Sequence, residues 1–229
     1  MIIHFTNNFK KLTSIISSSS FLLRYCGEYF GDKRGAIVSR AAHPMVSFSE
    51  YEHNELHNKT VTYGGYGIAL KKSWAVRNGL TPVNYIEKNS PVALGLIALL
   101  RSRQLGSLPK SLRLPVIQLK CFTKHVCGYN SHFKEDDFFF KYENEWRFVP
   151  TIQQIGGGRI SVDYSKYKKR ESLYNNRVAS YPLKFLRENV KYIYVQSAFE
   201  RQEIIDRFGF SERQVVISTW KQSIKSKNF

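Results

Sequence analysis

Short runs of alternating hydrophobic and polar residues are spread along the chain, and stretches with helical spacing separate them. Residues 2–6 predict a strand, and the apolar positions within 9–16 fall on one face of a helix. Asn7 or Asn8 can cap that helix, because a short amide side chain accepts a bond from a free backbone N–H. Further strands are expected at 45–49, 61–70, 82–86, 114–122, 145–149, 191–195 and 214–218, and further helices at 73–79, 91–103 and 198–208.

These elements indicate the α+β class. Strands and helices are mixed without the regular alternation of a doubly wound sheet, so we expect a mixed, mostly antiparallel or split sheet. Residues 21–36 are rich in turn formers, and residues 53–59 predict a loop. A chain of 229 residues with 42% hydrophobic content can form one large domain, and the glycine-rich stretch 155–170 is short enough for a surface loop. We therefore expect a single domain over 1–229 with a basic tail at about 221–229.

Positive charge is the strongest compositional feature: 35 Lys and Arg against 18 Asp and Glu give a net charge of +17. No acidic residue occurs from 88 to 134, and a second basic cluster, interleaved with tyrosines, lies at 164–170. Basic residues beside aromatic ones are typical of surfaces that bind phosphates and stack on bases. The expected partner is nucleic acid (RNA or DNA) or an acidic protein, and the alternative is an ordinary solvated surface. The residues expected to contact nucleic acid are Arg101, Arg103, Lys110, Arg113, Lys166, Lys168, Lys169 and Arg170.

Several other classes are disfavoured. No apolar run reaches the ~18 residues of a membrane helix, so no membrane partner is expected. The N-terminus does not have the pattern of a secretory signal, which favours a cytoplasmic protein. The three cysteines, Cys26, Cys121 and Cys127, are expected to be reduced thiols, and no metal site is expected because His125 beside Cys127 is not a set of zinc ligands.

Three sets of polar residues on or beside expected strands are candidates for chemistry. They are His4, the pair Ser47 and Ser49, and the pair Glu143 and Glu145, and alternation within a strand places each pair on one face. A histidine, hydroxyls and an acid from different strands could hold a ribose and stabilise an oxocarbenium-like centre. Each set also has a structural interpretation: a buried histidine, ordinary strand residues, and a glutamate that pairs with Arg147 or a lysine.

Glycines interrupt the strand expected at 61–70, within Tyr63-Gly64-Gly65-Tyr66-Gly67. They could bring backbone amides close to a ligand, and Tyr63 and Tyr66 could stack on a flat ring. Neither this stretch nor the three glycines at 156–158 form a phosphate loop, since no Gly-Lys-Ser or Gly-Lys-Thr follows them. The alternatives are a β-bulge and a loop, respectively.

An ordered series of blocks resembles the AbiGi family. The blocks are His4-Phe5-Thr6, Ala42 to Glu50, Tyr63 to Ala75, Pro82 to Tyr85, and Glu143-Asn144-Glu145-Trp146-Arg147, and the resemblance spans roughly residues 1 to 220. Members of this family are assigned to bacterial abortive-infection defence against phage, as the antitoxin of a two-gene AbiG system. The resemblance therefore implies a toxin–antitoxin role and a cognate AbiG toxin as partner.

The same blocks are distantly similar to ADP-ribosyltransferases, which implies an ADP-ribosyltransferase-like fold and NAD as cofactor. By this similarity His4 meets the nicotinamide ribose, Ser47 and Ser49 support the site, and Glu145 is the catalytic acid with Glu143 as its partner. Tyr63 or Tyr66 would stack on nicotinamide, and Arg40 would contact the NAD phosphates.

Two hypotheses follow. The first is an NAD-dependent transferase that modifies nucleic acid or a protein, and the second is a non-enzymatic antitoxin that neutralises its toxin or binds nucleic acid through the basic surface. The transferase requires His4 and Glu145 to face one cleft. It also predicts that Glu145→Gln abolishes activity while the melting temperature barely moves.

Overall fold

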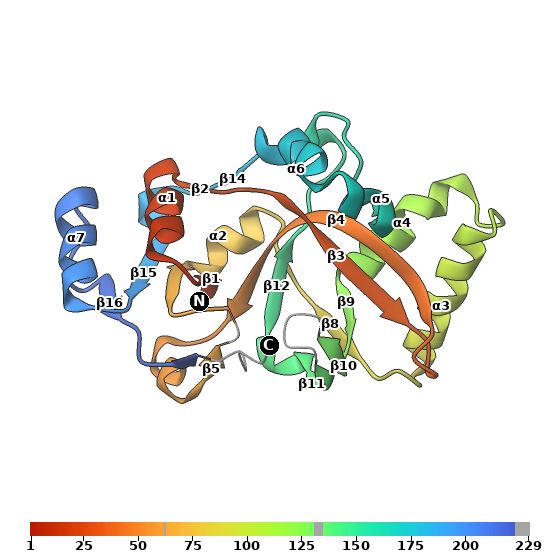
Figure 1. Cartoon of the computed structure of the whole chain (residues 1–229), viewed down its shortest axis with the longest axis horizontal. Helices are drawn as coiled ribbons and strands as arrows, with labels where there is room; N and C mark the ends of the chain where they lie inside the picture. Colours follow the sequence, from red (N-terminus) through yellow and green to blue (C-terminus); the bar gives the residue numbers. More distant parts are fainter. Residues whose placement is uncertain (62, 131–134, 223–229) are drawn as a thin grey trace.

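A nine-stranded sheet organises the part of the chain that the computed structural model describes, residues 1–61, 63–130 and 135–222 (Figure 1). All its strand pairs are antiparallel except β15 with β16, so the expected α+β class and the mostly antiparallel, mixed sheet are confirmed. The order is β16 (Val215–Ile217), β15 (Val190–Val195), β6 (Tyr66–Leu70), β1 (Ile2–Thr6), β4 (Ile37–Glu50), β12 (Glu145–Phe148) and β7 (Thr81–Pro82), with β13 (Val162–Asp163) and β3 (Arg24–Gly31) also paired to β4.

Strand β4 holds the fold together because it is long enough to serve two sets of partners. Its first half pairs with β3 and β13, and its second half pairs with β1 and β12. Four two-stranded sheets complete the strands: β10 (Cys127–Asn130) with β11 (Glu135–Phe139), β14 (Leu183–Lys184) with β2 (Ser20–Phe21), β17 (Lys221–Gln222) with β5 (Thr60–Val61), and β8 (Asn84–Ile86) with β9 (Thr123–His125).

Several helices begin or end at residues with clear capping chemistry. Asn8 accepts a bond from the Lys11 N–H at 3.3 Å, Ser90 accepts one from Ala93, and Gly209 ends the last helix with a φ of +70°. The α-helices are α1 (Phe9–Ser18), α2 (Lys72–Arg77), α3 (Pro91–Gln104), α4 (Lys110–Cys121), α5 (Tyr164–Lys169), α6 (Glu171–Ala179) and α7 (Ala198–Phe208), and the 3-10 helices are η1 (His53–Asn58), η2 (Phe140–Glu143), η3 (Gln153–Ile155) and η4 (Arg187–Asn189).

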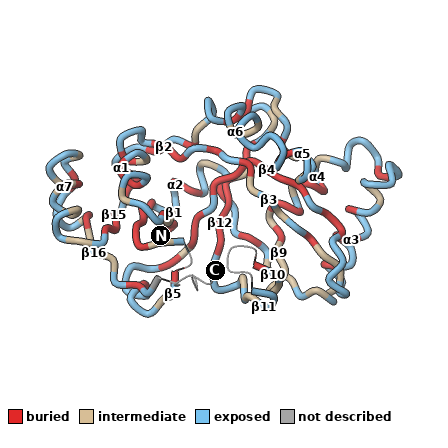
Figure 2. The backbone as a smooth tube through the Cα atoms, in the orientation of Figure 1, coloured by how far each residue is buried: buried red, intermediate tan, exposed pale blue. Residues whose placement is uncertain are grey.

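Both faces of the central strands are covered by two separate hydrophobic clusters. Much of β4 and β12 is accordingly buried (Figure 2). Ile2 and Phe48 belong to the main cluster, which lies beneath α1, α2 and α7. Ile3, next to Ile2, belongs to the second cluster with Tyr194 and Trp220. Neighbouring residues of β1 therefore project to opposite faces, as the pleat of a strand requires.

The structure corrects several sequence-based expectations. The strand expected at 114–122 is part of helix α4, whose buried side chains, Val116, Ile117, Lys120 and Cys121, recur at helical spacing. A short apolar run does not distinguish the two periods, and this helix also accommodates Pro115. The turn-rich stretch 21–36 contains β3, the loop expected at 53–59 forms η1, and the stretch 155–170 contains β13 and α5. Of the basic tail, residues 223–229 lie outside the described residues.

No helix in the described part of the chain is both long and apolar enough to cross a membrane.

Candidate functional site

Strand β12 places Glu145 beside β4, and the register aligns Glu145 with Ser49 and Arg147 with Ser47. Residues directly opposite each other on paired strands project to the same face of a sheet, so these four side chains share one face. The intervening Trp146 projects to the other face and joins the main hydrophobic cluster. Alternation along β12 thus separates its charged residues from the apolar core.

Three polar side chains engage both carboxylate oxygens of Glu145. Arg147 donates from Nε to Oε1 at 2.8 Å and from Nη2 to Oε2 at 3.0 Å. Lys124 Nζ lies 3.0 Å from Oε2, and Ser47 Oγ donates to Oε1 at 2.7 Å. The side chains of Glu145 and Arg147 are only 9% and 1% exposed. Ion pairs connect Glu145, Arg147 and Lys124 to two further carboxylates, Glu28 and Glu143. We call these five residues the Glu145 network.

The charges of this network stabilise one another. Burial alone would raise the pKa of Glu145, but Arg147 and Lys124 outweigh burial and hold that pKa well below its ordinary value. The two carboxylates likewise raise the pKa of Lys124 despite its burial. Both groups are therefore charged at neutral pH. The expectation that Glu145 pairs with Arg147 or a lysine is confirmed, and its carboxylate is neutralised before any ligand arrives.

Glu143 reaches the network by a different route from the expected one. It ends η2 rather than lying on β12, and Asn144 between the two glutamates adopts a left-handed φ of +41°. Strand alternation was therefore the wrong reason to place the glutamates together. Lys124 brings them together instead, with Nζ 2.9 Å from Glu143 Oε2, and Tyr63 donates to Glu143 Oε1 at 2.9 Å.

His4 lies on the opposite face of the sheet from Glu145. Ile3 is aligned with Ser49, so the next residue of β1 projects to the other face. The His4 ring packs against Phe21 and Phe48 of the main cluster, with ring centroids 5.0 and 5.5 Å away. Burial lowers the pKa of His4, and its Nδ1 lies 2.9 Å from the Ser47 carbonyl oxygen. The expectation that His4 and Glu145 face one cleft is wrong.

The residues expected to bind a cofactor are also separated. Tyr66 is buried in the main cluster and donates to Glu200 of α7 at 2.8 Å, so it is not placed to stack on a ligand. Arg40 lies far along β4 from Ser47, where its guanidinium stacks on Tyr29 and Tyr164.

One small cavity does collect three of the expected site residues, Ser49, Tyr63 and Glu143. Its volume is about 300 Å³, and its walls come from β4, β5, β11 and η2. That volume is at the lower end of the range of small-molecule sites. Most of the remaining lining is aromatic, with Phe5 and Tyr51 among the residues that close it.

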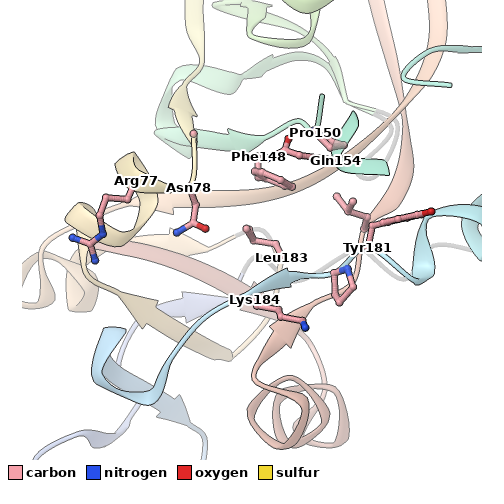
Figure 3. Close-up of a pocket in the computed structure, with 11 residues that line it drawn as sticks. Arg77, Asn78, Phe148, Pro150, Gln154, Tyr181, Leu183 and Lys184 are labelled. Atoms are coloured by element: carbon pink, nitrogen blue, oxygen red, sulfur yellow. The ribbon is translucent and has the colours of Figure 1, made fainter. Parts of the chain in front are cut away.

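A larger cavity, of about 520 Å³, contains none of the expected site residues (Figure 3). It lies between Leu23, the end of α2, the stretch from the end of β12 to Gln154, and the segment 181–184. Phe148 and Leu183 lie across from each other, while Arg77 points away from both. The sequence contained no signal for this cavity, because its walls come from four separate segments.

The expected nucleic-acid contacts do not share one environment. Arg101 pairs with Asp32 at 3.2 Å, and Arg113 donates to the carbonyls of Leu108 and Gly106. Lys168 pairs with Glu171 at 2.9 Å. Arg103 is half-buried and its Nε has no partner within the described residues. The remaining four, Lys110, Lys166, Lys169 and Arg170, are exposed.

Two lysines of the acid-free stretch are internal, which the sequence did not predict. Lys120 is 1% exposed, donates to the Glu28 carbonyl at 3.2 Å and lies 3.3 Å from Nε2 of the buried His43. Burial lowers the pKa of Lys120 to about 8 and that of His43 to about 3. Lys124 neutralises Glu143 and Glu145 as described above. Part of the basic excess therefore balances buried groups instead of facing solvent.

Metal chemistry finds no support in the described ranges 1–61, 63–130 and 135–222, where no group of three or more His, Cys, Asp or Glu side chains could hold an ion. Cys26, Cys121 and Cys127 are all free thiols. Burial raises the pKa of both Cys26 and Cys121 to about 12, so neither is a reactive thiolate.

Comparison with known proteins agrees with the block resemblance. A family model described as "Putative abortive phage resistance protein AbiGi, antitoxin" matches residues 19–196. No curated protein and no solved structure matches the chain. The match covers well over half of the 229 residues and includes β4, β12 and the Glu145 network. The chain therefore belongs to the AbiGi family of abortive phage resistance proteins.

Proposed function

We propose that this protein is a non-enzymatic antitoxin that neutralises its cognate AbiG toxin by direct contact. The observation that carries the proposal is the state of Glu145, the residue that a transferase would need to stabilise a cation on its substrate. Arg147, Lys124 and Ser47 occupy both of its oxygens. Two cations already neutralise this carboxylate, so its net electrostatic attraction for a positive charge that develops on a substrate is small.

Family membership and charge support the same proposal. The AbiGi description names an antitoxin, and a protein with a net charge of +17 is suited to an acidic partner. We infer that binding alone, without any chemical step, suffices for protection of the toxin-expressing cell.

In the test, the toxin is expressed in bacteria with and without this protein, and growth is measured. The affinity between the two purified proteins is then determined. Growth rescue together with a stable complex and no consumption of NAD is the expected result. If rescue requires NAD, or occurs without a complex, the direct-contact mechanism is wrong.

An NAD-dependent transferase is the second candidate, and it would have to act without His4, which lies on the opposite face of the sheet from Glu145. One observation favours it: Ser47, Ser49 and Glu145 share one face of the neighbouring strands β4 and β12. Its test is turnover of NAD by the purified protein with nucleic acid or the toxin present as acceptor.

Nucleic acid is the third possible ligand, through exposed Lys166, Lys169 and Arg170 beside the stacked Arg40 and Tyr164. Counterion release would then make the logarithm of the affinity fall steeply with the logarithm of the salt concentration. Charge reversal of these three residues, two in α5 and one at its C-cap, would abolish such binding but would not affect binding of an acidic toxin elsewhere on the protein.

A further inference from the structure

Helix α3 differs from an ordinary surface helix because it is apolar on both of its faces. Its inner face, Ala93, Leu96, Ile97 and Leu100, packs on β3, β4 and α4 in a cluster that includes Phe30. These positions recur at the spacing of one helical face, so they account for the folding of α3. They do not account for its other side.

The outer side of α3 exposes large hydrophobic side chains at the edge of the molecule (Figures 1 and 2). Val92 is 64% exposed, Leu94 49%, Leu99 37%, and Leu105 at the C-cap 84%. A helix at the surface of a globular protein normally carries charged or polar residues on this side, and a helix that is apolar all round is normally buried. With 3.6 residues per turn, Leu94 and Leu105 fall on one flank of this side and Val92 and Leu99 on the other. Exposed apolar side chains gathered on one helix are typical of an interaction site.

The charges around this face select the partner. Leu94, Arg101 and Leu105 lie at spacings of seven and four residues and so form one stripe, about 16 Å long. Arg101 is 56% exposed within that stripe, and exposed Lys110 begins the neighbouring helix α4. No acidic residue occurs anywhere from 88 to 134. A second copy of this chain would bring cations against cations, whereas an acidic partner would complement them.

We infer that the outer face of α3 is the docking surface for an amphipathic, acidic segment of the cognate toxin. Leu94 and Leu105 are the apolar anchors. Arg101 already pairs with Asp32 through Nη2, and its other guanidinium donors contact a carboxylate of the partner. Apolar anchors at the centre of an interface with charges at its rim are the usual arrangement of protein complexes. The inference rests on the proposed toxin-binding function and adds to it the surface that performs it.

The test measures the affinity of the purified cognate toxin for wild-type protein and for two double variants. Leu94→Gln with Leu105→Gln removes the two anchors. Leu186→Gln with Phe199→Gln is the matched control, because these residues are 65% and 79% exposed but lie outside α3. We expect the α3 variant to lose about thirtyfold or more in affinity and the control to bind like wild type. Both variants should keep the wild-type melting temperature, since all four side chains are exposed.

Arg101→Glu forms the second arm and tests the charge of the partner. It should weaken binding and reduce the dependence of the affinity on salt, because one attractive pair becomes repulsive. The inference is overturned if the α3 variants bind the toxin as wild type does. It is also overturned if the wild-type protein is a dimer that these variants dissociate, or if the α3 face binds anionic vesicles while toxin binding is unaffected. Absence of any wild-type complex would instead overturn the proposed function itself, and this inference with it.

Discussion

Arg147 engages both carboxylate oxygens of Glu145, the residue two positions before it on strand β12. The two side chains lie on the same face because strand residues alternate. Arg147 also donates from Nη2 to Glu28 and from Nη1 to the Cys121 carbonyl. Among the described residues whose side chains are fully buried, Arg147 is the largest. A site that resembles a catalytic motif in sequence is thus a buried ion-pair network in three dimensions.

The first prediction concerns Glu145→Gln. The amide keeps the shape of the side chain but cannot balance Arg147 and Lys124, and breaking a buried ion pair leaves charges uncompensated. We expect the free energy of unfolding to fall by about 3 kcal/mol, as measured by urea denaturation. This replaces the sequence-based expectation that the melting temperature barely moves.

Glu212→Gln is the control for that prediction. Glu212 also pairs with an arginine, Arg201, but its side chain is 79% exposed. Solvent screens such pairs, so its loss should cost less than about 0.5 kcal/mol. Equal stability of the two variants would show that the Glu145 network does not stabilise the fold.

The second prediction concerns buried Lys120, whose folded-state pKa of about 8 lies below the unfolded value of about 10.4. Below pH 8 both states carry the proton and the full penalty of a buried charge is present. Above pH 8 the folded state loses its proton first, so this residue makes the protein more stable as the pH rises toward 10.4. Relative to Lys120→Met, wild type should gain about 2 kcal/mol of unfolding free energy between pH 7 and 10.

Exposed Lys110→Met provides the reference for the titration. Its unfolding free energy should follow that of wild type over the same range, because this variant keeps Lys120 and changes only an exposed side chain. A Lys120→Met variant that also follows wild type would mean that Lys120 titrates at its ordinary pKa.

The third prediction concerns Gly64, in the glycine-rich stretch 63–67, which on sequence grounds could bring backbone amides close to a ligand. Its φ is +123°, and a Cβ there would lie 2.4 Å from the Thr6 carbonyl oxygen and from Asn7 Cα. The glycine is needed for close approach to β1, so Gly64→Ala should cost about 3 kcal/mol. The Gly64 carbonyl also accepts a bond from Trp220 Nε1 at 3.0 Å.

Gly106→Ala isolates the backbone part of that cost. Gly106 has a φ of +78° but open space around its Cβ position, so only the left-handed conformation is penalised, by about 1 kcal/mol. Thermal denaturation of both variants measures the difference. If both lose the same stability, the contact with β1 is not the reason for a glycine at position 64.

The local pattern of the chain determined the elements with strong periodicity or clear caps. Strand β1, the Asn8-capped α1, the Ser90-capped α3 and Gly209-terminated α7 were all expected, as was the α+β class. Alternation also correctly placed Ser47 and Ser49 on one face. These features depend on neighbours within a few residues, which is the information that a sequence contains directly.

Only the tertiary structure decided what the polar residues do. Which face of the sheet His4 occupies depends on the register of β1 with β4, a pairing between residues about 46 positions apart in the chain. Lys120 and Lys124 seemed part of a basic surface, yet α4 and β9 carry them inward to Glu28, Glu143 and Glu145. The outer face of α3 is defined only by the tertiary structure, because β3, β4 and α4 cover the opposite side of the helix. Burial and partner choice arise from contacts between distant segments, so the same charged residue can be a surface cation or a buried counterion.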